Sequence, residues 1–535
     1  MSYKSNAENI FLGVLAITTV RDFLEVALEG KILLRSDDPM YSLKNYFLHF
    51  NSFYFLVYAL MSLVLYFFAR KKTSVSECFR VGALAMILIW IGPLFDYFIL
   101  GAFDMIYPRD PLNVVVNIHR LFDPNYDFEG LSCGMRVEIF LAGVGGLVYL
   151  WYKTRRLFPS FCGAICLVLT PVALGLLIPF LTQYYEYGFH FGYHPLYNSV
   201  LLHQGFVVHG TGCKIALLYL FLCLMVFSLA YYVRNPRFFL AIFSNCRWTR
   251  SVHYLLLFVA GLIYVYHNPP IPDLSNTEDL EYLMTIWNHP SDIFGIFMAS
   301  VSILLSFQSA VIFNDIYDYD IDIVSNADRP LVSQSISLSE YMLIGKLFAI
   351  IALTVSFCIS ETFFFFVLLY LLLSFLYSTP PFRLRNYFLI SNVELATIFL
   401  VTFHAGAVVL ISDYRFDIIP IHITFGLLLI YALALTVKDS KDYEGDKKSN
   451  VQTLYTLFGR KGGDIMTAIF VCCAILLTPI LLHLTHLLFY SVCVCLLFLL
   501  IIVVIRNSRS KERFVVLLYY FYVLSMFSFL IFKHE

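Results

Sequence analysis

Long apolar stretches recur along this chain from one end to the other. A helix needs about 20 largely apolar residues to cross a bilayer, and fifteen such runs can be read in the 535 residues. Hydrophobic residues make up 60% of the chain and charged residues only 14%, whereas about a quarter of the residues of a soluble domain are charged. Water cannot solvate such a surface. We therefore predict an all-α polytopic membrane protein with about fifteen transmembrane helices.

A basic stretch divides these runs into two groups. It covers residues 234–250, contains four arginines and is interpreted as an interfacial linker. Six runs precede it, near 9–29, 49–69, 81–101, 136–152, 160–182 and 214–233. Nine runs follow it, near 253–269, 291–313, 338–357, 361–377, 390–411, 417–436, 464–483, 486–505 and 514–532. The division predicts two membrane modules, residues 1–244 and residues 245–535.

The loop charges predict an orientation. Met1 to Asn9 is short and polar and has no cleavage site after it, so the first run is expected to stay in the membrane. With the N-terminus in the cytoplasm, 25 Lys and Arg fall in cytoplasmic segments. The opposite segments hold Lys31, Arg35, Lys44, Arg109, Arg120, Arg415 and Lys533. This bias follows the positive-inside rule and predicts a multi-pass protein of the cytoplasmic (inner) membrane with its C-terminus outside.

Two acidic clusters follow apolar runs on the predicted cytoplasmic side. The first reads Asn-Asp-Ile-Tyr-Asp-Tyr-Asp-Ile-Asp over residues 314–322, and the second reads Lys-Asp-Ser-Lys-Asp-Tyr-Glu-Gly-Asp over residues 438–446. In each cluster three aspartates stand at positions i, i+3 and i+7, which share one face of a helix. These aspartates are Asp315, Asp318 and Asp322 in the first cluster, and Asp439, Asp442 and Asp446 in the second.

Carboxylates gathered in this way need a compensating cation, because they repel one another and a helix C-terminus disfavours them further. Mg²⁺ prefers oxygen ligands and commonly shares carboxylates with a phosphate. Arg329, Arg383 and Lys438 lie near the clusters and could neutralise such a phosphate from the other side. The alternative for the acids is two solvated loops that fix topology, although acids contribute little to topology. The alternative for each cation is a positive-inside role.

The motifs resemble those of a known family, the UbiA superfamily of intramembrane prenyltransferases. Residues 314–322 match its NDxxDxxxD motif, and the Asp-Arg-Pro-Leu of residues 328–331 is similar to the continuation of that motif. The Tyr-Ser-Thr-Pro-Pro-Phe-Arg-Leu-Arg of residues 377–385 resembles a further loop, and residues 442–459 resemble the second Asp-rich segment. The resemblance covers about residues 245–535 and implies a nine-helix bundle.

The resemblance also implies roles for individual residues. Two Mg²⁺ ions would be held by Asp315, Asp318, Asp322, Asp439, Asp442 and Asp446. Of these, Asp318, Asp322, Asp442 and Asp446 are the predicted catalytic residues. The isoprenyl diphosphate would contact Asn314, Arg329, Tyr377, Arg383, Lys438 and Arg250, and its chain would lie between helices in a tunnel open to lipid.

The implied reaction is Mg²⁺-dependent transfer of a polyprenyl group from its diphosphate to a lipophilic or interfacial acceptor. An aromatic ring and a glycerol-phosphate lipid hydroxyl are the candidate acceptors, and aromatic side chains such as Tyr317 could stabilise an allylic cation. Two alternatives stay open: phosphoribosyl transfer to a polyprenyl phosphate, and a non-enzymatic transporter. Residues 333–335 and 453–455 depart from the family pattern and leave the subfamily open. No nucleic-acid partner is predicted, and the oligomeric state is left open.

The N-terminal module resembles no family that we recognise. Arg21, Asp22 and Glu25 interrupt its first apolar run and could pair on one helix face, and Asp96 is a second charged position inside a run. Such intramembrane charges usually face protein or water. The predicted external loop 183–213 is rich in His and Tyr. We expect an ordered aromatic loop there, with zinc binding by His190 and His194, which have i, i+4 spacing, as the alternative.

Overall fold

The structure is a computed structural model in which the chain divides into two compact units. Unit 1 comprises Met1–Phe239 and Trp287–Gly295, and unit 2 comprises Leu240–Ile286 and Ile296–Glu535. The described residues are 6–29, 39–100, 108, 111–123, 126, 128, 130–187, 207–208, 210–268, 290–410, 419–440, 443–448, 451–504 and 508–531. These residues form helices and connecting turns, and their one β contact is an isolated bridge between Phe128 and Leu131.

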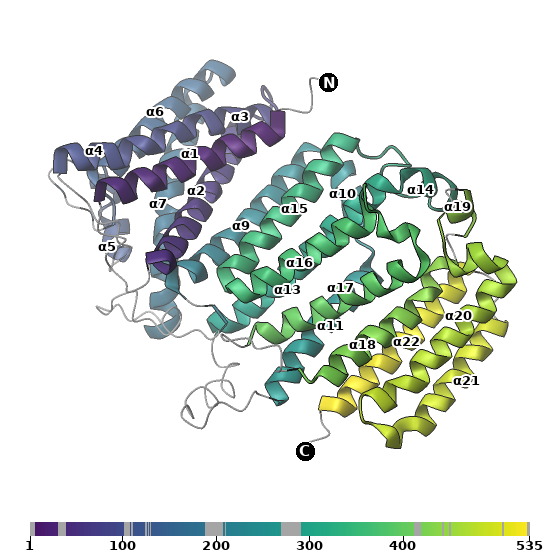
Figure 1. Ribbon diagram of the computed structural model, residues 1–535. Helices are drawn as coiled ribbons and strands as arrows, with labels where there is room; N and C mark the ends of the chain where they lie inside the picture. The colour runs from purple at the N-terminus through teal and green to yellow at the C-terminus, as the bar shows by residue number, and fades with distance from the viewer. Residues whose placement is uncertain are drawn as a thin grey trace, which may run out of the picture. The chain divides into compact units, whose positions relative to one another are not determined.

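Unit 1 is built from long and short helices that pack against one another (Figure 1). They are α1 (Asn6–Glu29), α2 (Pro39–Ala69), α3 (Val75–Ala85), α4 (Ile91–Leu100), α5 (Pro111–Val116), α6 (Cys133–Thr154), α7 (Leu157–Tyr187) and α9 (Thr211–Arg234). A short 3₁₀ helix, Met86–Trp90, joins α3 to α4. The largest core cluster surrounds Leu56 and Tyr219, which are fully buried between α2 and α9. The helix α10 (Pro236–Ser244) crosses the boundary between the units in the sequence.

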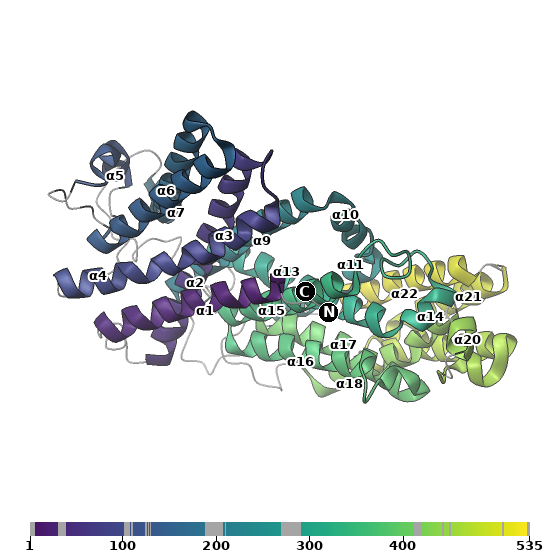
Figure 2. The same cartoon turned by 90° about the horizontal axis from the view of Figure 1, so that it is seen from above.

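Unit 2 contains nine long helices among its described residues. They are α11 (Trp248–His267), α13 (Pro290–Tyr317), α15 (Leu338–Ile359), α16 (Glu361–Ser378), α17 (Phe388–Val408), α18 (Ile421–Ala434), α20 (Leu454–Leu481), α21 (Leu488–Val504) and α22 (Ser508–Ile531). Figure 2 shows α20, α21 and α22 as neighbours in a second view, which agrees with their packing against one another. The first residues of α13 belong to unit 1.

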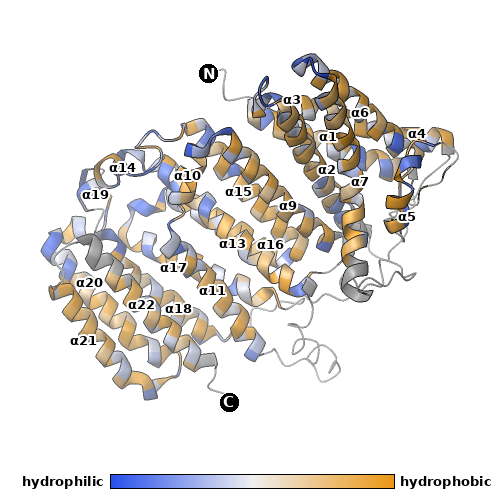
Figure 3. Ribbon diagram, turned by 180° about the vertical axis from the view of Figure 1, so that it is seen from behind, coloured by the Kyte–Doolittle hydropathy of each residue, from blue (hydrophilic) through white to orange (hydrophobic). Residues whose placement is uncertain are grey.

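Most of the predicted membrane spans are confirmed. Thirteen helices among the described residues are long and apolar enough to cross a membrane, and their surfaces are predominantly hydrophobic in Figure 3. The protein is therefore an integral multi-pass membrane protein. The first and last predicted runs form α1 and α22, which fall outside those thirteen spans. Charged residues interrupt α1, and the apolar part of α22 is the shorter stretch Leu517–Phe529.

Small residues and polar caps explain two features of unit 2. A Cβ on Gly261 of α11 would lie 1.9 Å from the carbonyl oxygen of Phe403, and one on Gly406 of α17 would lie 1.8 Å from that of Phe258. Only glycine therefore permits these two helices to cross so closely, as small residues do in other membrane bundles.

Thr453 caps α20 through a reciprocal pair of hydrogen bonds with Thr456, which satisfies N–H groups that have no intrahelical partner.

Both acidic clusters lie where long helices give way to short ones. After α13 the chain leaves helical geometry at Asp318 and resumes as α14 (Tyr319–Ser325). After α18 it continues as a 3₁₀ helix, Leu435–Ser440, and then as α19 (Tyr443–Lys448). The expectation that each cluster occupies one continuous helix face is therefore wrong. These interruptions instead bring α14 and α19 into contact at one end of the unit 2 bundle (Figure 1).

Candidate active site

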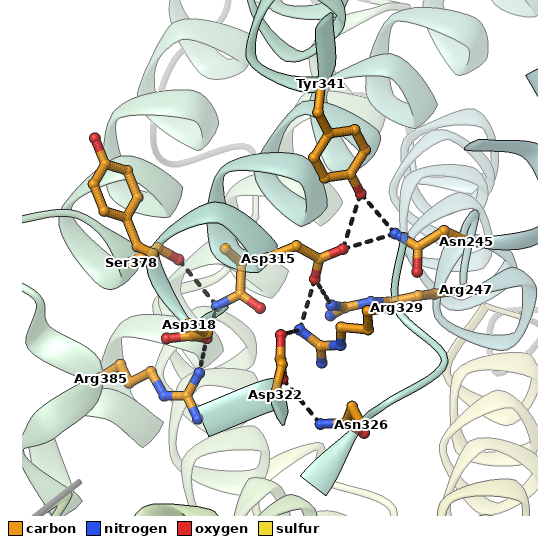
Figure 4. Close-up of polar contacts among 12 residues, drawn as sticks. Asn245, Arg247, Asp315, Asp318, Asp322, Asn326, Arg329, Tyr341, Ser378 and Arg385 are labelled. Atoms are coloured by element: carbon orange, nitrogen blue, oxygen red, sulfur yellow. Dashed lines mark hydrogen bonds and ion pairs between the residues drawn. The ribbon is translucent and has the colours of Figure 1, made fainter. Parts of the chain in front are cut away.

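Three of the four aspartates in the first cluster point into the protein. Asp315, Asp318 and Asp322 are buried, whereas Asp320 is exposed. Burying an unpaired charge is costly, so each buried carboxylate requires cations or hydrogen-bond donors. Figure 4 shows that arginine, asparagine and tyrosine side chains surround them. The predicted i, i+3, i+7 set is thus the set that faces inward, despite the break at Asp318.

Asp315 lies at the end of α13 and contacts three other segments of unit 2. Its Oδ1 pairs with Arg247 at 2.5 Å and with Arg329 at 2.6 Å. Its Oδ2 accepts hydrogen bonds from Asn245 Nδ2 at 2.7 Å and from the Tyr341 hydroxyl at 2.9 Å. The carboxylate therefore accepts two contacts on each oxygen, two of them charge-assisted and correspondingly strong.

Asp318 is fully buried at the break between α13 and α14. Asn314 Nδ2 donates to its Oδ2 at 2.6 Å, and Arg383 Nη2 approaches its Oδ1 at 3.1 Å. Arg385 forms a further ion pair with Oδ2. Asn314 and Arg383, both predicted diphosphate contacts, are therefore gathered around this one carboxylate.

Asp322 is the third buried acid of the first cluster, in α14. Arg329 pairs with it as well as with Asp315, and Asn326 Nδ2 donates to its Oδ1 at 3.0 Å. Burial raises the pKa of the Asp322 carboxyl to about 6, although Arg329 opposes this shift. Burial likewise lowers the pKa of the Arg247 guanidinium to about 10, against the opposing effect of Asp315. Both shifts come first from the loss of water around a charged group.

One arginine joins the two acidic clusters. Arg385 pairs with Asp318 of the first cluster and, through Nη2 at 3.2 Å, with Asp446 of the second. Asp446 and Asp439 are both buried. Asp442 lies outside the described residues. The predicted meeting of two distant stretches of chain is therefore observed for Asp318 and Asp446.

The remaining predicted contacts surround a tyrosine of α16. Lys438 Nζ donates to the Tyr377 hydroxyl at 3.1 Å and lies 5.3 Å from the centre of its ring. Arg250 lies in the first turn of α11. Both Arg250 and Asp439 interact electrostatically with Tyr377 and Lys438. The structure thus gathers all the predicted site residues that it describes at one end of unit 2.

Guanidinium groups lie between the carboxylates of the site. Arg329 bridges Asp315 to Asp322, and Arg385 bridges Asp318 to Asp446. Within the described parts of the chain, no three His, Cys, Asp or Glu side chains are arranged as the ligands of one metal ion. The metal-ligand roles of these aspartates therefore remain a prediction.

The sequence interpretation missed several residues of this site. Asn245 and Arg247 come from the stretch interpreted only as a linker, and Tyr341 comes from an apolar run. Glu394 of α17 is a further buried acid. Its oxygens have no hydrogen-bond partner among the described residues, and it interacts electrostatically with Lys438. A lone Glu in an apolar run was the available signal, because such residues are commonly functional.

Comparison with known proteins places the likeness in the C-terminal part of the chain. Residues 282–527 match the UbiA prenyltransferase family. Digeranylgeranylglyceryl phosphate synthase of Methanosphaera stadtmanae is 27% identical over 38% of this chain and 71% of that protein. Homogentisate phytyltransferase of Synechocystis sp. is 26% identical over 34% of this chain and 62% of its own length, so the match spans less than two thirds of that relative.

A solved structure is similar as well. It is a UbiA homologue from Archaeoglobus fulgidus bound to DMAPP and Mg²⁺, which is 18% identical. The match covers 52% of this chain and 97% of that protein, with a TM-score of 0.35.

Proposed function

Because residues 282–527 match the UbiA prenyltransferase family, we propose that this protein transfers a polyprenyl group from its diphosphate to a lipophilic or interfacial acceptor. The observation that carries the proposal is Arg385, which contacts carboxylates of both acidic clusters. It brings two motifs far apart in the sequence to one buried location. Buried charge concentrated at one place is typical of a site that handles charged substrates.

The composition of the site suits a diphosphate. Among the described residues, six cations surround the cluster: Arg247, Arg250, Arg329, Arg383, Arg385 and Lys438. Arginine binds phosphate oxygens with paired donors, and lysine acts as a point charge. We propose that Arg250, Arg329, Arg383 and Lys438, with Asn314 and Tyr377, hold the diphosphate in place.

The buried carboxylates suit Mg²⁺. Asp315, Asp318, Asp322, Asp439 and Asp446 are buried and offer the hard oxygen atoms that this ion prefers. With Asp442, these residues would hold the metal, and two ions are proposed. Bound Mg²⁺ would neutralise the charge that develops on the departing diphosphate. The arginines that now pair with the aspartates would then be available to the phosphate oxygens.

The proposed reaction breaks the bond between the allylic carbon and the diphosphate oxygen and forms a bond from that carbon to the acceptor. The acceptor loses a proton, and diphosphate leaves. The named relatives suggest two acceptor classes, a glycerol-phosphate lipid hydroxyl and an aromatic ring such as homogentisate. We also propose that residues 245–535 form the catalytic module, that residues 1–244 form a separate one, and that the site faces the cytoplasm in the inner membrane.

The test uses the full chain, purified in detergent, with labelled geranylgeranyl diphosphate, Mg²⁺ and each acceptor class in turn. A labelled lipid should form with one class and disappear when EDTA is added. Asp318→Asn and Asp446→Asn should each lower the rate by more than the roughly 100-fold that loss of an outer-shell partner costs at a metal site.

Asp320→Asn is the matched control, because Asp320 belongs to the same motif but is exposed. Its rate should equal that of the unmodified protein. Product formation that survives EDTA, or equal rates in all three variants, would overturn the proposed function.

A further inference from the structure

Unit 1 contains a large cavity of its own. Its volume is about 470 Å³, within the range of about 300–1,000 Å³ typical of small-molecule sites. Its walls come from α2, α3, α6 and α7, and most of them are apolar or aromatic side chains such as Phe53 and Leu167. Three of these four helices, α2, α6 and α7, are apolar enough to cross a membrane by themselves, and α3 forms part of a fourth such span. A ligand of this cavity must therefore be lipophilic.

One carboxylate interrupts this apolar lining. Glu138 of α6 is 8% exposed and is the only charged side chain among the described residues that line the cavity. It accepts one hydrogen bond within the described chain, from the Gly92 N–H to Oε1 at 2.6 Å. The other oxygen, Oε2, accepts no hydrogen bond from the residues that the structure describes. An acid with spare hydrogen-bonding capacity inside a membrane unit usually marks a functional position.

Two glycines hold Glu138 in this position. Gly92 lies where the 3₁₀ helix Met86–Trp90 passes into α4, and a Cβ there would lie 2.2 Å from Glu138 Oε1. In the reverse direction, the Gly134 N–H at the start of α6 donates to Asp96 Oδ1 at 2.7 Å. The helices α4 and α6 therefore exchange two hydrogen bonds, each from a glycine N–H to a carboxylate. These two hydrogen bonds fix the position of Glu138 relative to α4.

Two other glycines leave space for the cavity. Gly145 of α6 and Gly175 of α7 both line it, and a Cβ at either position would meet no other atom within 4 Å. Side chains could be added there without displacing a neighbour. The cavity therefore depends on the absence of side chains at these positions and can be filled by substitution.

The surrounding charges limit what can bind. Arg21 forms ion pairs with Asp22 and Glu25, and it also interacts electrostatically with Glu138. With Asp96, four carboxylates thus lie around the guanidinium of Arg21. The other buried arginine of α6, Arg136, donates to the backbone carbonyls of Asp123 and Tyr126. An anionic ligand would be repelled. A hydroxyl group can donate to an ionised Glu138 or accept from a protonated one, so it pairs with this side chain in either state.

We propose that the unit 1 cavity binds one neutral lipophilic alcohol or phenol, whose hydroxyl group hydrogen-bonds to Glu138 and whose apolar part fills the space beside Gly145 and Gly175. None of the cavity's lining residues belongs to the diphosphate site proposed for unit 2, so the proposal does not depend on the proposed prenyl transfer. The excess of carboxylates excludes phosphorylated lipids from the cavity.

The test applies a long-chain alcohol that carries a photoreactive diazirine to the full-length protein in detergent, and mass spectrometry locates the label. The alcohol should label cavity peptides of α6 and α7 saturably. Gly175→Leu should reduce this labelling by at least about tenfold, which corresponds to 1.4 kcal/mol. Gly13→Leu is the matched control, because a Cβ on Gly13 also meets no atom within 4 Å and Gly13 does not line the cavity. Gly145→Leu is a second filling variant in case Gly175→Leu lowers the melting temperature.

The head group is tested by competition with unlabelled compounds of the same chain length. A long-chain carboxylic acid should compete at least about tenfold more weakly than the alcohol, and Glu138→Gln should remove most of that difference. Equal competition by acid and alcohol against the unmodified protein would overturn the proposal. Labelling that is unchanged in both filling variants would do the same.

Discussion

Unit 2 gathers the buried aspartates of its two acidic clusters where long helices end, whereas unit 1 has buried carboxylates within α1, α4 and α6. At the unit 2 site, the aspartates of the described chain are surrounded by five arginines and a lysine. In unit 1, Asp22, Glu25, Asp96 and Glu138 accompany the guanidinium of Arg21, while the buried Arg136 is directed to backbone carbonyls. Both arrangements keep charge away from lipid.

The difference in charge balance separates two kinds of site. A surplus of cations interleaved with acids can accept an anion such as diphosphate, together with the metal ions that the acids would hold. A surplus of acids beside an apolar cavity favours a ligand without negative charge. Substitutions of single charged residues therefore test whether the charges of each unit serve the reaction or the fold.

Arg385→Leu is expected to have the largest effect on turnover. Arg385 contacts Asp318 and Asp446, so its loss removes the link between the two acidic clusters and one donor to the proposed diphosphate. Losing one such preorganised donor costs about 10²–10³ in rate. The formation of labelled lipid measures the loss. Arg460→Leu is the control, because Arg460 pairs with Glu444 at 3.8 Å and both side chains are largely exposed. A similar loss of rate in both variants would mean that the ion pairs of Arg385 with Asp318 and Asp446 have no special role in turnover.

Asn245→Ala is expected to have an intermediate effect. Asn245 donates to Asp315 Oδ2 and, at 2.8 Å, also contacts the Tyr341 hydroxyl, so it acts as a positioning residue for a proposed metal ligand. The Mg²⁺ concentration that gives half-maximal rate should rise about 10- to 100-fold, while the rate at saturating Mg²⁺ should change less.

The control for that variant is Asn235→Ala. Asn235 caps α10 by accepting from the Phe238 N–H and lies outside the set of residues that contact the acidic clusters. Its Mg²⁺ dependence should match that of the unmodified protein. An unchanged Mg²⁺ requirement in Asn245→Ala would remove the link between this stretch and the metal site.

Arg21→Met is expected to have the smallest effect on turnover and a large one on stability. Removing one partner of a buried ion pair costs about 3–5 kcal/mol, and Arg21 is buried with Asp22 and Glu25 as its partners. The melting temperature should fall, while turnover per folded molecule should be nearly unchanged. Arg70→Met, at an exposed position of the same unit, should change stability by less than about 0.5 kcal/mol. Lost turnover in folded Arg21→Met protein would mean that unit 1 takes part in the reaction.

Local patterns in the sequence predicted much of this molecule. The apolar runs predicted thirteen spans that are confirmed. The spacing of Asp315, Asp318 and Asp322 correctly separated the buried acids from the exposed Asp320. The proposed pairing of Arg21 with Glu25 is also observed. All of these signals repeat over a few residues, so a single sequence can reveal them.

Contacts between distant residues could not be predicted in the same way. Asn245 and Asp315 are 70 residues apart, and a single asparagine in a basic stretch has no periodic signal. The cavity beside Gly145 and Gly175 depends on which side chains reach that space, and hydropathy does not encode this. Most of the expected aromatic loop 183–213, including His190 and His194 of the alternative zinc site, lies outside the described residues.

The change of direction at Asp318 restricts how this motif can vary in length. Each residue of an α-helix turns the chain by about 100°, and α14 is only seven residues long. One residue inserted between Asp318 and Asp322 would rotate the later carboxylate away from Arg329 toward solvent. Homologous chains that keep this site should therefore have a constant number of residues between these two aspartates, even where the loops on either side differ in length.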